Sequence, residues 1–312
     1  MTKTEKMSDA VAKKDLLHCF RDPVSTGTSE EGALRLLSGF PYPEQVWKIR
    51  EQWVDYDSDD RGSSLLYYAC RNGWYDVSRK LVEQYHCDVH LKNRWSDHAD
   101  APLHYACQEN GNIDIVRFLV VEQHCDPACC GRWGMTPLHY ACERGKLDIV
   151  KFLVEQCHCD PRVQDEGNCT PLHRACKKDG NIDIVRFLVV EQHCDPACRG
   201  WWGRAPLHWA CSGGKLDIVR FLVEECHCNP RVRDYCSDTP LHWACKVNGN
   251  IDIVGFLIVE QHCDPTCHHS RGTPLHYACE SGKLDIVRFL VEECHCDPRV
   301  QYLDYNTPLH WA

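Results

Sequence analysis

The chain has 312 residues, of which 43% are hydrophobic and 26% charged, so it holds enough apolar material for a folded core. Its formal net charge of −10 argues against the basic surface typical of nucleic-acid-binding proteins. The N-terminus lacks the apolar core of a signal peptide, and no apolar run approaches the roughly 20 residues of a membrane span. We therefore expect a protein of the cytosol or the nucleus, with its 24 cysteines reduced.

The N-terminal part of the chain shows no repeat. Residues 1–28 are polar and are expected to be largely unstructured, with a short helix at 9–20. Residues 30–37 and 44–54 have the amphipathic spacing of two helices. We interpret 29–62 as a degenerate capping repeat, because the terminal unit of a repeat array needs a polar outer face.

From residue 63 onward one motif recurs every 34 or 35 residues. It reads TPLHYAC at Thr136–Cys142 and TPLHWAC at Thr239–Cys245. The turn after the motif is alternately longer and shorter, so we interpret a pair of repeats as the unit of duplication. The predicted repeats of the domain 63–312 are 63–100, 101–135, 136–169, 170–204, 205–238, 239–272 and 273–306, followed by a truncated copy at 307–312.

Each repeat reads as helix, turn, helix and loop. In the copy that begins at Thr136, Pro137 suits the first position of a helix, where a missing N–H costs no hydrogen bond. Gly145 breaks the chain before a second helix, 147–155, which is polar along one stripe and apolar elsewhere. Two such helices cannot bury their apolar surface alone, so the repeats are expected to stack.

The sequence resembles the ankyrin-repeat family through its T-P-L-H-x-A signature, from about Ser63 to the last residue. The resemblance implies an all-α ankyrin-repeat solenoid of stacked helix-turn-helix units, with projecting loop fingers and a concave groove. It also implies a structural role for the motif histidines, which bond the backbone of neighbouring loops. These residues are His104, His139, His173, His208, His242 and His276.

One departure from the family lies at the end of the second helix, where ankyrin repeats usually place a glycine in the left-handed conformation. This chain has histidine there, one of the residue types that tolerate a positive φ. The seven residues are His86, His124, His158, His193, His227, His262 and His295. Because they recur once per repeat, we interpret them as structural.

The content of cysteine and histidine raises the question of a metal or catalytic site, which the spacing does not favour. Clusters at 124–130 and 263–269 have zinc-type ligands without the usual paired spacing. The chain has no phosphate-binding loop with lysine, no G-x-S-x-G elbow and no H-E-x-x-H motif. We therefore predict no catalytic residue, no metal site and no cofactor, and we expect that the protein is not an enzyme.

Residues that differ from repeat to repeat are the candidates for partner binding. In ankyrin-repeat proteins the loop fingers and inner helices line the binding groove, and tryptophan, tyrosine and arginine dominate interface energies. The candidates are Arg132, Trp133, Glu143, Arg144, Lys177, Lys178, Trp201, Trp202, Arg204 and Tyr235. For the three tryptophans two interpretations stay open: contact with a partner, or packing between neighbouring loops.

These patterns predict a protein–protein interaction scaffold or adaptor, whose partner is another protein rather than nucleic acid or a membrane. Two alternatives remain. The chain could be the recognition part of a larger enzyme or signalling protein, because it stops inside the first helix of a repeat. It could also be a redox- or metal-responsive scaffold, because it is rich in cysteine.

Overall fold

The structure, a computed structural model, describes residues 16, 18–39, 65–91, 100–108, 110–177, 180–246, 250–268, 272–301 and 306–312. The predicted helix at 44–54, most of that at 9–20 and the candidate Lys178 lie outside these residues. The chain forms two compact units. Unit 1 comprises Met1–Ala141 and Asp148–Cys159, and unit 2 comprises Cys142–Leu147 and Asp160–Ala312.

The described residues form helices and loops, without a β-sheet, which confirms the predicted all-α fold. The elements of unit 1 are α2 (Pro23–Thr26), α3 (Glu30–Ser38), α6 (Leu65–Arg71), α7 (Tyr75–Glu83), α8 (Pro102–Ala106), α9 (Ile113–Arg117), η1 (Phe118–Glu122), η2 (Arg132–Gly134), α11 (Leu147–Lys151) and η3 (Phe152–Gln156). Helix α10 (Pro137–Glu143) contributes to both units, and so does α11, whose first residue Leu147 belongs to unit 2. Unit 2 continues with α12 (Pro171–Ala175), α13 (Ile182–Arg186), η4 (Phe187–Glu191), η5 (Trp201–Gly203), α14 (Pro206–Gly213), α15 (Leu216–Arg220), η6 (Phe221–Glu225), α16 (Pro240–Ala244), α17 (Ile251–Gly255), η7 (Phe256–Glu260), α18 (Pro274–Glu280), α19 (Leu284–Arg288), η8 (Phe289–Glu293) and η9 (Pro308–Trp311).

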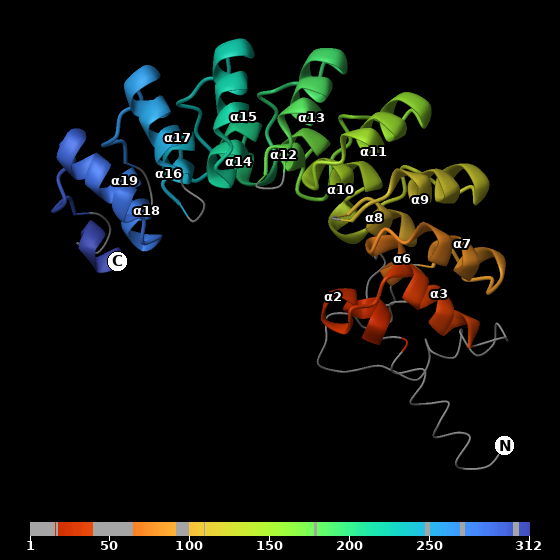
Figure 1. The fold of residues 1–312 in the computed structure, drawn as a ribbon. Coiled ribbons are helices and arrows are strands. Elements are labelled where there is room, and N and C mark those ends of the chain that lie inside the picture. The colour runs from red at the N-terminus through yellow and green to blue at the C-terminus, as the bar shows by residue number, and fades with distance from the viewer. Residues whose placement is uncertain are drawn as a thin grey trace. The chain divides into compact units, whose positions relative to one another are not determined.

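Stacked helix pairs build unit 2. The first helices α14, α16 and α18 contact one another in chain order, and so do the second helices α13, α15, α17 and α19 (Figure 1). In the repeat that holds α14 and α15, the turn is made by Gly214 at φ 73°, a conformation that suits glycine. Ile218 and Leu222 of the second helix are fully buried, so neighbouring repeats share one continuous apolar core.

The second helix of each repeat ends in a widened turn. In η6 the amide of Cys226 donates to the carbonyl of Phe221, and the amide of Cys228 donates to that of Leu222, five and six residues back. Ankyrin repeats typically span about 33 residues, and an extra residue inside a helix is commonly accommodated as a π-type turn. The longer period of this chain is therefore absorbed at the helix end.

Histidine closes each of these widened turns in the left-handed conformation. The seven helix-end histidines have φ values between 52° and 55°, as in His86 and His124, which confirms that histidine takes the place of the usual glycine. All seven side chains are exposed.

The N-terminal helices of unit 1 pack against α7. The hydroxyl of Tyr85 donates to the carbonyl of Leu37 at 2.8 Å. The ring of Phe20 meets the indole of Trp74 edge-on, with 5.3 Å between centroids. Buried contacts therefore begin ahead of the segment 29–62 that we interpret as the cap.

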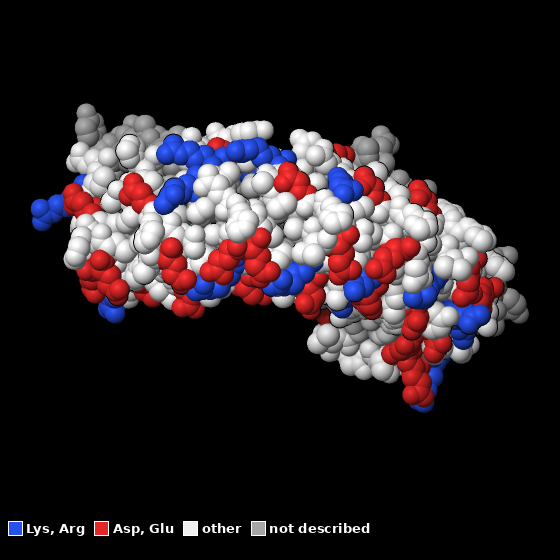
Figure 2. All heavy atoms as spheres, turned by 90° about the horizontal axis from the view of Figure 1, so that it is seen from above, with Lys and Arg blue, Asp and Glu red and all other residues white. Residues whose placement is uncertain are grey.

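A row of ion pairs joins the second helices of unit 2. Arg186 pairs with Glu225 at 2.6 Å, and its guanidinium lies 4.4 Å from the centroid of the Phe221 ring. Arg220 pairs in the same way with Glu260, also at 2.6 Å. Figure 2 shows acidic and basic side chains interleaved along this face. The row stops at Gly255, which occupies the position of these arginines in the next repeat.

We predict that Gly255→Arg stabilises the last helix pairs. A Cβ at Gly255 meets no atom within 4 Å, and the helical backbone there accepts any L-residue. Glu293 occupies in the next repeat the position that Glu225 and Glu260 occupy in theirs, so an arginine at 255 should reach it. Gly255→Ala should add about 1 kcal/mol from helix propensity alone. Gly255→Arg should add roughly another 0.5 kcal/mol from the ion pair.

Native-state amide exchange at residues 251–260 measures this effect locally, which matters because repeat arrays need not unfold in one step. An arginine variant no better protected than the alanine variant would show that the row of ion pairs contributes nothing to stability.

Candidate functional site

The motif histidines fix the position of the loop fingers. In the repeat that begins at Thr170, the backbone amide of Thr170 donates to Nδ1 of His173 at 3.1 Å. Because Nδ1 accepts, the ring proton is on Nε2, which donates to the carbonyl of Arg204 at 3.1 Å in the next finger. His208 bonds the carbonyl of Asp238 in the same way, at 3.2 Å.

The other motif histidines share one or both of these contacts. Nε2 of His104 bonds the carbonyl of Cys129 at 3.1 Å, and that of His276 lies 3.4 Å from the carbonyl of Asn306. His139 and His242 accept the amide of the threonine that begins their own repeat. The fingers are thus anchored by buried side chains.

Burial keeps these rings neutral. The pKa values of His173 and His208 are lowered to about 4, chiefly because the imidazolium form would lose its hydration inside the stack. A protonated ring would also present a second N–H to the amide that now donates to it. Both rings are therefore structural donors and are not available for acid–base chemistry near neutral pH.

Two fingers share an unusual turn with tryptophan at its centre. Trp133 and Trp202 have φ values of 61° and 58°, and each is followed by a glycine that also has positive φ. Two-residue turns of this kind strongly prefer asparagine, aspartate or glycine at the tryptophan position. A bulky residue in the left-handed region costs roughly 1–2 kcal/mol, so the tryptophans destabilise the turns that carry them.

The alternate fingers are closed by aspartate. Oδ1 of Asp165 accepts the amides of Gly167 and Cys169, and Oδ1 of Asp234 accepts the equivalent pair. The carboxylate fixes these loops without help from their tips. Tyr235, which follows Asp234, is therefore free to point outward.

Three aromatic side chains of unit 2 gather on adjacent fingers. The indoles of Trp201 and Trp202 lie 6.4 Å apart between centroids. The amide of Tyr235 donates to the carbonyl of Trp202 at 2.8 Å, and its ring lies against Gly203, where a Cβ would come within 2.4 Å. The exposed fractions are 56% for Trp201, 51% for Trp202 and 74% for Tyr235. Packing between loops thus leaves more than half of each side chain accessible.

The charged candidates on the inner helices are engaged with one another. Glu143 accepts from Lys177 at 3.0 Å and lies 3.6 Å from Arg174, which also pairs with the buried Asp165. The ammonium of Lys177 lies 5.2 Å from the centroid of the Trp209 ring. These residues form a half-buried network of ion pairs rather than a rim of free charges around a binding surface.

Arg204 is held by a similar set of contacts. Its guanidinium stacks on Trp243, 4.0 Å from the ring centroid, and its Nε lies 3.5 Å from the buried carboxylate of Asp234. Trp209 and Trp243 occupy the variable position x of the T-P-L-H-x-A motif, and the sequence analysis did not include them among the candidates. Their position directly after the motif histidine is the sequence feature that could have identified them.

Unit 2 holds seven of the ten candidate binding residues: Glu143, Arg144, Lys177, Trp201, Trp202, Arg204 and Tyr235. Unit 1 holds Arg132 and Trp133. The guanidinium carbon of Arg132 lies 5.3 Å from the centroid of the Trp133 ring, and Trp133 is 58% exposed.

A family model described as ankyrin repeats (3 copies) matches residues 35–129, 103–200, 190–269 and 247–312. The chain belongs to the ankyrin-repeat family. Ankyrin repeats are generally protein–protein interaction modules. A search of curated proteins found no match. Within the described residues, no helix is long and apolar enough to cross a bilayer.

The cysteines of this ankyrin array divide by burial. Cys142, Cys176 and Cys245, which follow the motif alanine, are fully buried, and desolvation raises their pKa values well above the usual range. They act as small apolar core residues. Of the 24 cysteines, Cys130 alone is exposed. Among the described residues, no three histidine, cysteine or acidic side chains are grouped to hold a metal ion; His269 of the predicted cluster 263–269 lies outside them.

We predict that alkylation of the native protein at pH 8 modifies Cys130 first and leaves Cys142, Cys176 and Cys245 unmodified. The thiolate is the reactive form, and burial disfavours it at the three core positions. Mass spectrometry of peptides at successive times gives the order. Alkylation in denaturant without reductant should modify nearly all 24 cysteines. Disulfides recovered there, or stoichiometric zinc in the purified protein, would instead support a redox- or metal-responsive scaffold.

Proposed function

We propose that the finger surface, defined as Trp201, Trp202 and Tyr235, is where this ankyrin-repeat protein docks another protein. The observation that carries the proposal is the left-handed backbone of Trp202 combined with its exposure. The equivalent residue Trp133 shows both features in unit 1. A strained residue whose side chain gains little from its own fold is typical of a functional position.

The chemistry of the finger surface suits an interface anchor. Tryptophan and tyrosine are enriched among residues whose truncation costs most in protein complexes. Their rings bury a large apolar area on binding and lose little side-chain freedom. The motif histidines hold the backbone beneath them, so the partner meets a preorganised surface.

The role that follows is that of an adaptor or scaffold without catalysis, acting in the cytosol or the nucleus. Free thiols at all 24 cysteine positions are consistent with a reducing compartment. The engaged network around Glu143 and Lys177 supports the fingers rather than providing a rim.

We predict that Trp202→Gly raises the stability of the protein while weakening partner binding. Glycine adopts the left-handed conformation without strain, so about 1 kcal/mol of folding free energy should be gained. Thermal unfolding and the affinity for a partner captured by pull-down are measured on the same preparation. A lower melting temperature for Trp202→Gly would identify the indole as a packing residue and contradict the proposal.

We also predict that Trp201→Ala combined with Trp202→Ala removes most binding. Truncating one true anchor costs roughly 2–4 kcal/mol, or about 30-fold to 1000-fold in affinity. Val190→Ala is the matched control, because Val190 is an equally exposed apolar residue of unit 2 on a second helix. If the double variant keeps its helical signal and binds like the Val190 variant, the assignment of the finger surface is wrong.

A further inference from the structure

The loops that border the finger surface differ in charge from their equivalents in the same chain. The segment 229–233 reads NPRVR, whereas the equivalent segments 160–164 and 297–301 both read DPRVQ. One repeat thus loses a carboxylate at Asn229 and gains a guanidinium at Arg233. Asn229 still accepts the amide of Arg231 through Oδ1, as the aspartates do for their loops, so the change leaves the local fold intact.

The neighbouring loop changes in the same direction. Arg199 stands where the other long repeats have Cys130 and His268. Its guanidinium donates to the carbonyl of Gly203 at 2.9 Å and to that of Arg233 at 2.8 Å. Arg199 therefore lies between the finger of Trp202 and the loop that leads to Tyr235.

The arginines of these loops have no acidic partner. Arg162, Arg199, Arg231 and Arg233 are exposed, and no carboxylate of a described residue lies within 4.0 Å of any of them. Arg162 and Arg231 donate to carbonyls at the ends of the next second helix, as Arg231 does to His262 at 2.7 Å. The guanidinium groups of Arg162, Arg199 and Arg231 are thus held by hydrogen bonds to carbonyls and are not neutralised by a carboxylate of a described residue.

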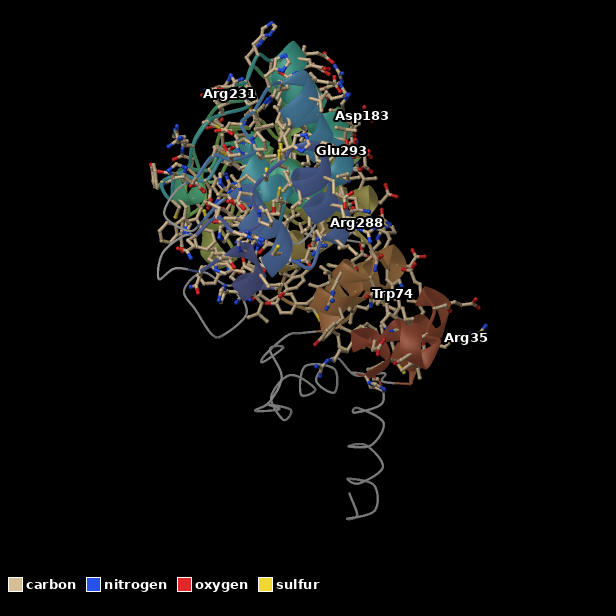
Figure 3. The ribbon with its side chains drawn as sticks, turned by 90° about the vertical axis from the view of Figure 1, so that its left-hand side faces the viewer. Arg35, Trp74, Asp183, Arg231, Arg288 and Glu293 are labelled. Atoms are coloured by element: carbon tan, nitrogen blue, oxygen red, sulfur yellow. The ribbon has the colours of Figure 1, made fainter. Side chains whose placement is uncertain are left out.

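These four arginines form what we call the arginine edge. It contrasts with the second helices, where Arg186 and Arg220 are neutralised by glutamates. Figure 3 shows Arg231 on the loop side of unit 2, opposite Glu293 on the helix side.

Two features run against the basic charge at this edge. Asp160 and Asp195 are exposed in the same loops as Arg162 and Arg199, but their Oδ1 atoms accept the amides of Arg162 and Ala197. Trp201 replaces the Arg132 of the equivalent finger, which exchanges a charge for an aromatic ring. The result is a strip of exposed guanidinium groups beside three exposed aromatic rings.

We propose that the partner presents an acidic segment to the arginine edge, with an apolar side chain of that segment seated against Trp202 and Tyr235. This inference rests on the proposed function of the finger surface. Carboxylates match the guanidinium geometry, and unneutralised charge of one sign steers an oppositely charged partner. The overall charge of −10 repels a polyanion such as nucleic acid at long range, which favours a short acidic stretch of protein.

The test uses the substitutions that the chain itself carries in equivalent loops. The reversion variant combines Arg199→His, Asn229→Asp and Arg233→Gln, each the residue found at the same place in another repeat. The probe is a fluorescein-labelled 12-residue peptide of alternating glutamate and leucine, followed by anisotropy at pH 7.5. A lysine–leucine peptide and a 12-nucleotide single-stranded DNA are the comparison ligands. Arg79→Gln in unit 1 lowers the net charge by one, as Asn229→Asp alone does, and is the charge control for that single variant.

We expect the wild type and Arg79→Gln to bind the acidic peptide, with affinity that falls as NaCl is raised from about 50 to 200 mM. The reversion variant should bind it at least about tenfold more weakly, because charge pairs that become desolvated in an interface are worth more than 1.4 kcal/mol. Asn229→Asp alone, which keeps the Oδ1 acceptor, should give a smaller loss in the same direction. The lysine peptide should not bind.

Equal affinity of the wild type and the reversion variant for the acidic peptide would overturn the inference, as would no binding by the wild type or tighter binding of the DNA. The two proposals fail separately. A pulled-down partner that is lost from Trp201→Ala/Trp202→Ala but bound fully by the reversion variant supports the finger surface and contradicts an acidic partner. A partner that is bound fully by Trp201→Ala/Trp202→Ala but lost from the reversion variant contradicts the finger surface and leaves the arginine edge as a separate site.

Discussion

The hydrogen bonds of the neutral motif histidine are the constraint on which this protein depends. One ring nitrogen accepts the amide at the start of its own repeat, and the other donates to the finger of the next repeat, as His173 does for Thr170 and Arg204. The same ring thus fixes the entry of a helix and the base of a finger. Because this hydrogen bond joins two neighbouring repeats, the position of each finger depends on the preceding repeat as well as on its own loop.

In this arrangement the residues that hold a finger in place differ from the residues exposed at its tip. The carbonyl of Arg204 and the hairpin bond from Gly200 to Arg204 hold the finger, so its tip is free to carry residues that the fold does not need. Trp202 can occupy a strained backbone position, and Tyr235 can stay exposed, without loss of the frame beneath them. Under the proposed function, recognition would vary through the finger tips and loop edges, while the histidines and buried cysteines repeat.

The periodicity of the sequence predicted most of the fold, because every repeat packs in the same way and its residues recur at fixed spacing. The helix pairs followed from the local pattern, whereas the roles of the motif histidines and of the helix-end histidines followed from the resemblance to ankyrin repeats. The contact of Lys177 with Glu143 and that of Arg199 with the carbonyl of Arg233 followed from neither, because each joins residues 34 positions apart in sequence. The exposure of Trp202 also needed the structure, since the sequence left partner contact and loop packing equally open.

The central claim is that the motif histidines are buried, neutral and protonated on Nε2. Imidazole nitrogen and carbon shifts in NMR spectra recorded from pH 7 to pH 4 test it directly. Because the folded pKa of His173 and His208 lies near 4, below the usual value of about 6.5, both rings should stay in the neutral Nε2–H form at pH 5.5. Their contribution to stability should then be lost as the pH falls from about 6.5 towards 4. Rings protonated at pH 5.5 in the folded protein, or neutral rings with the proton on Nδ1, would contradict the account.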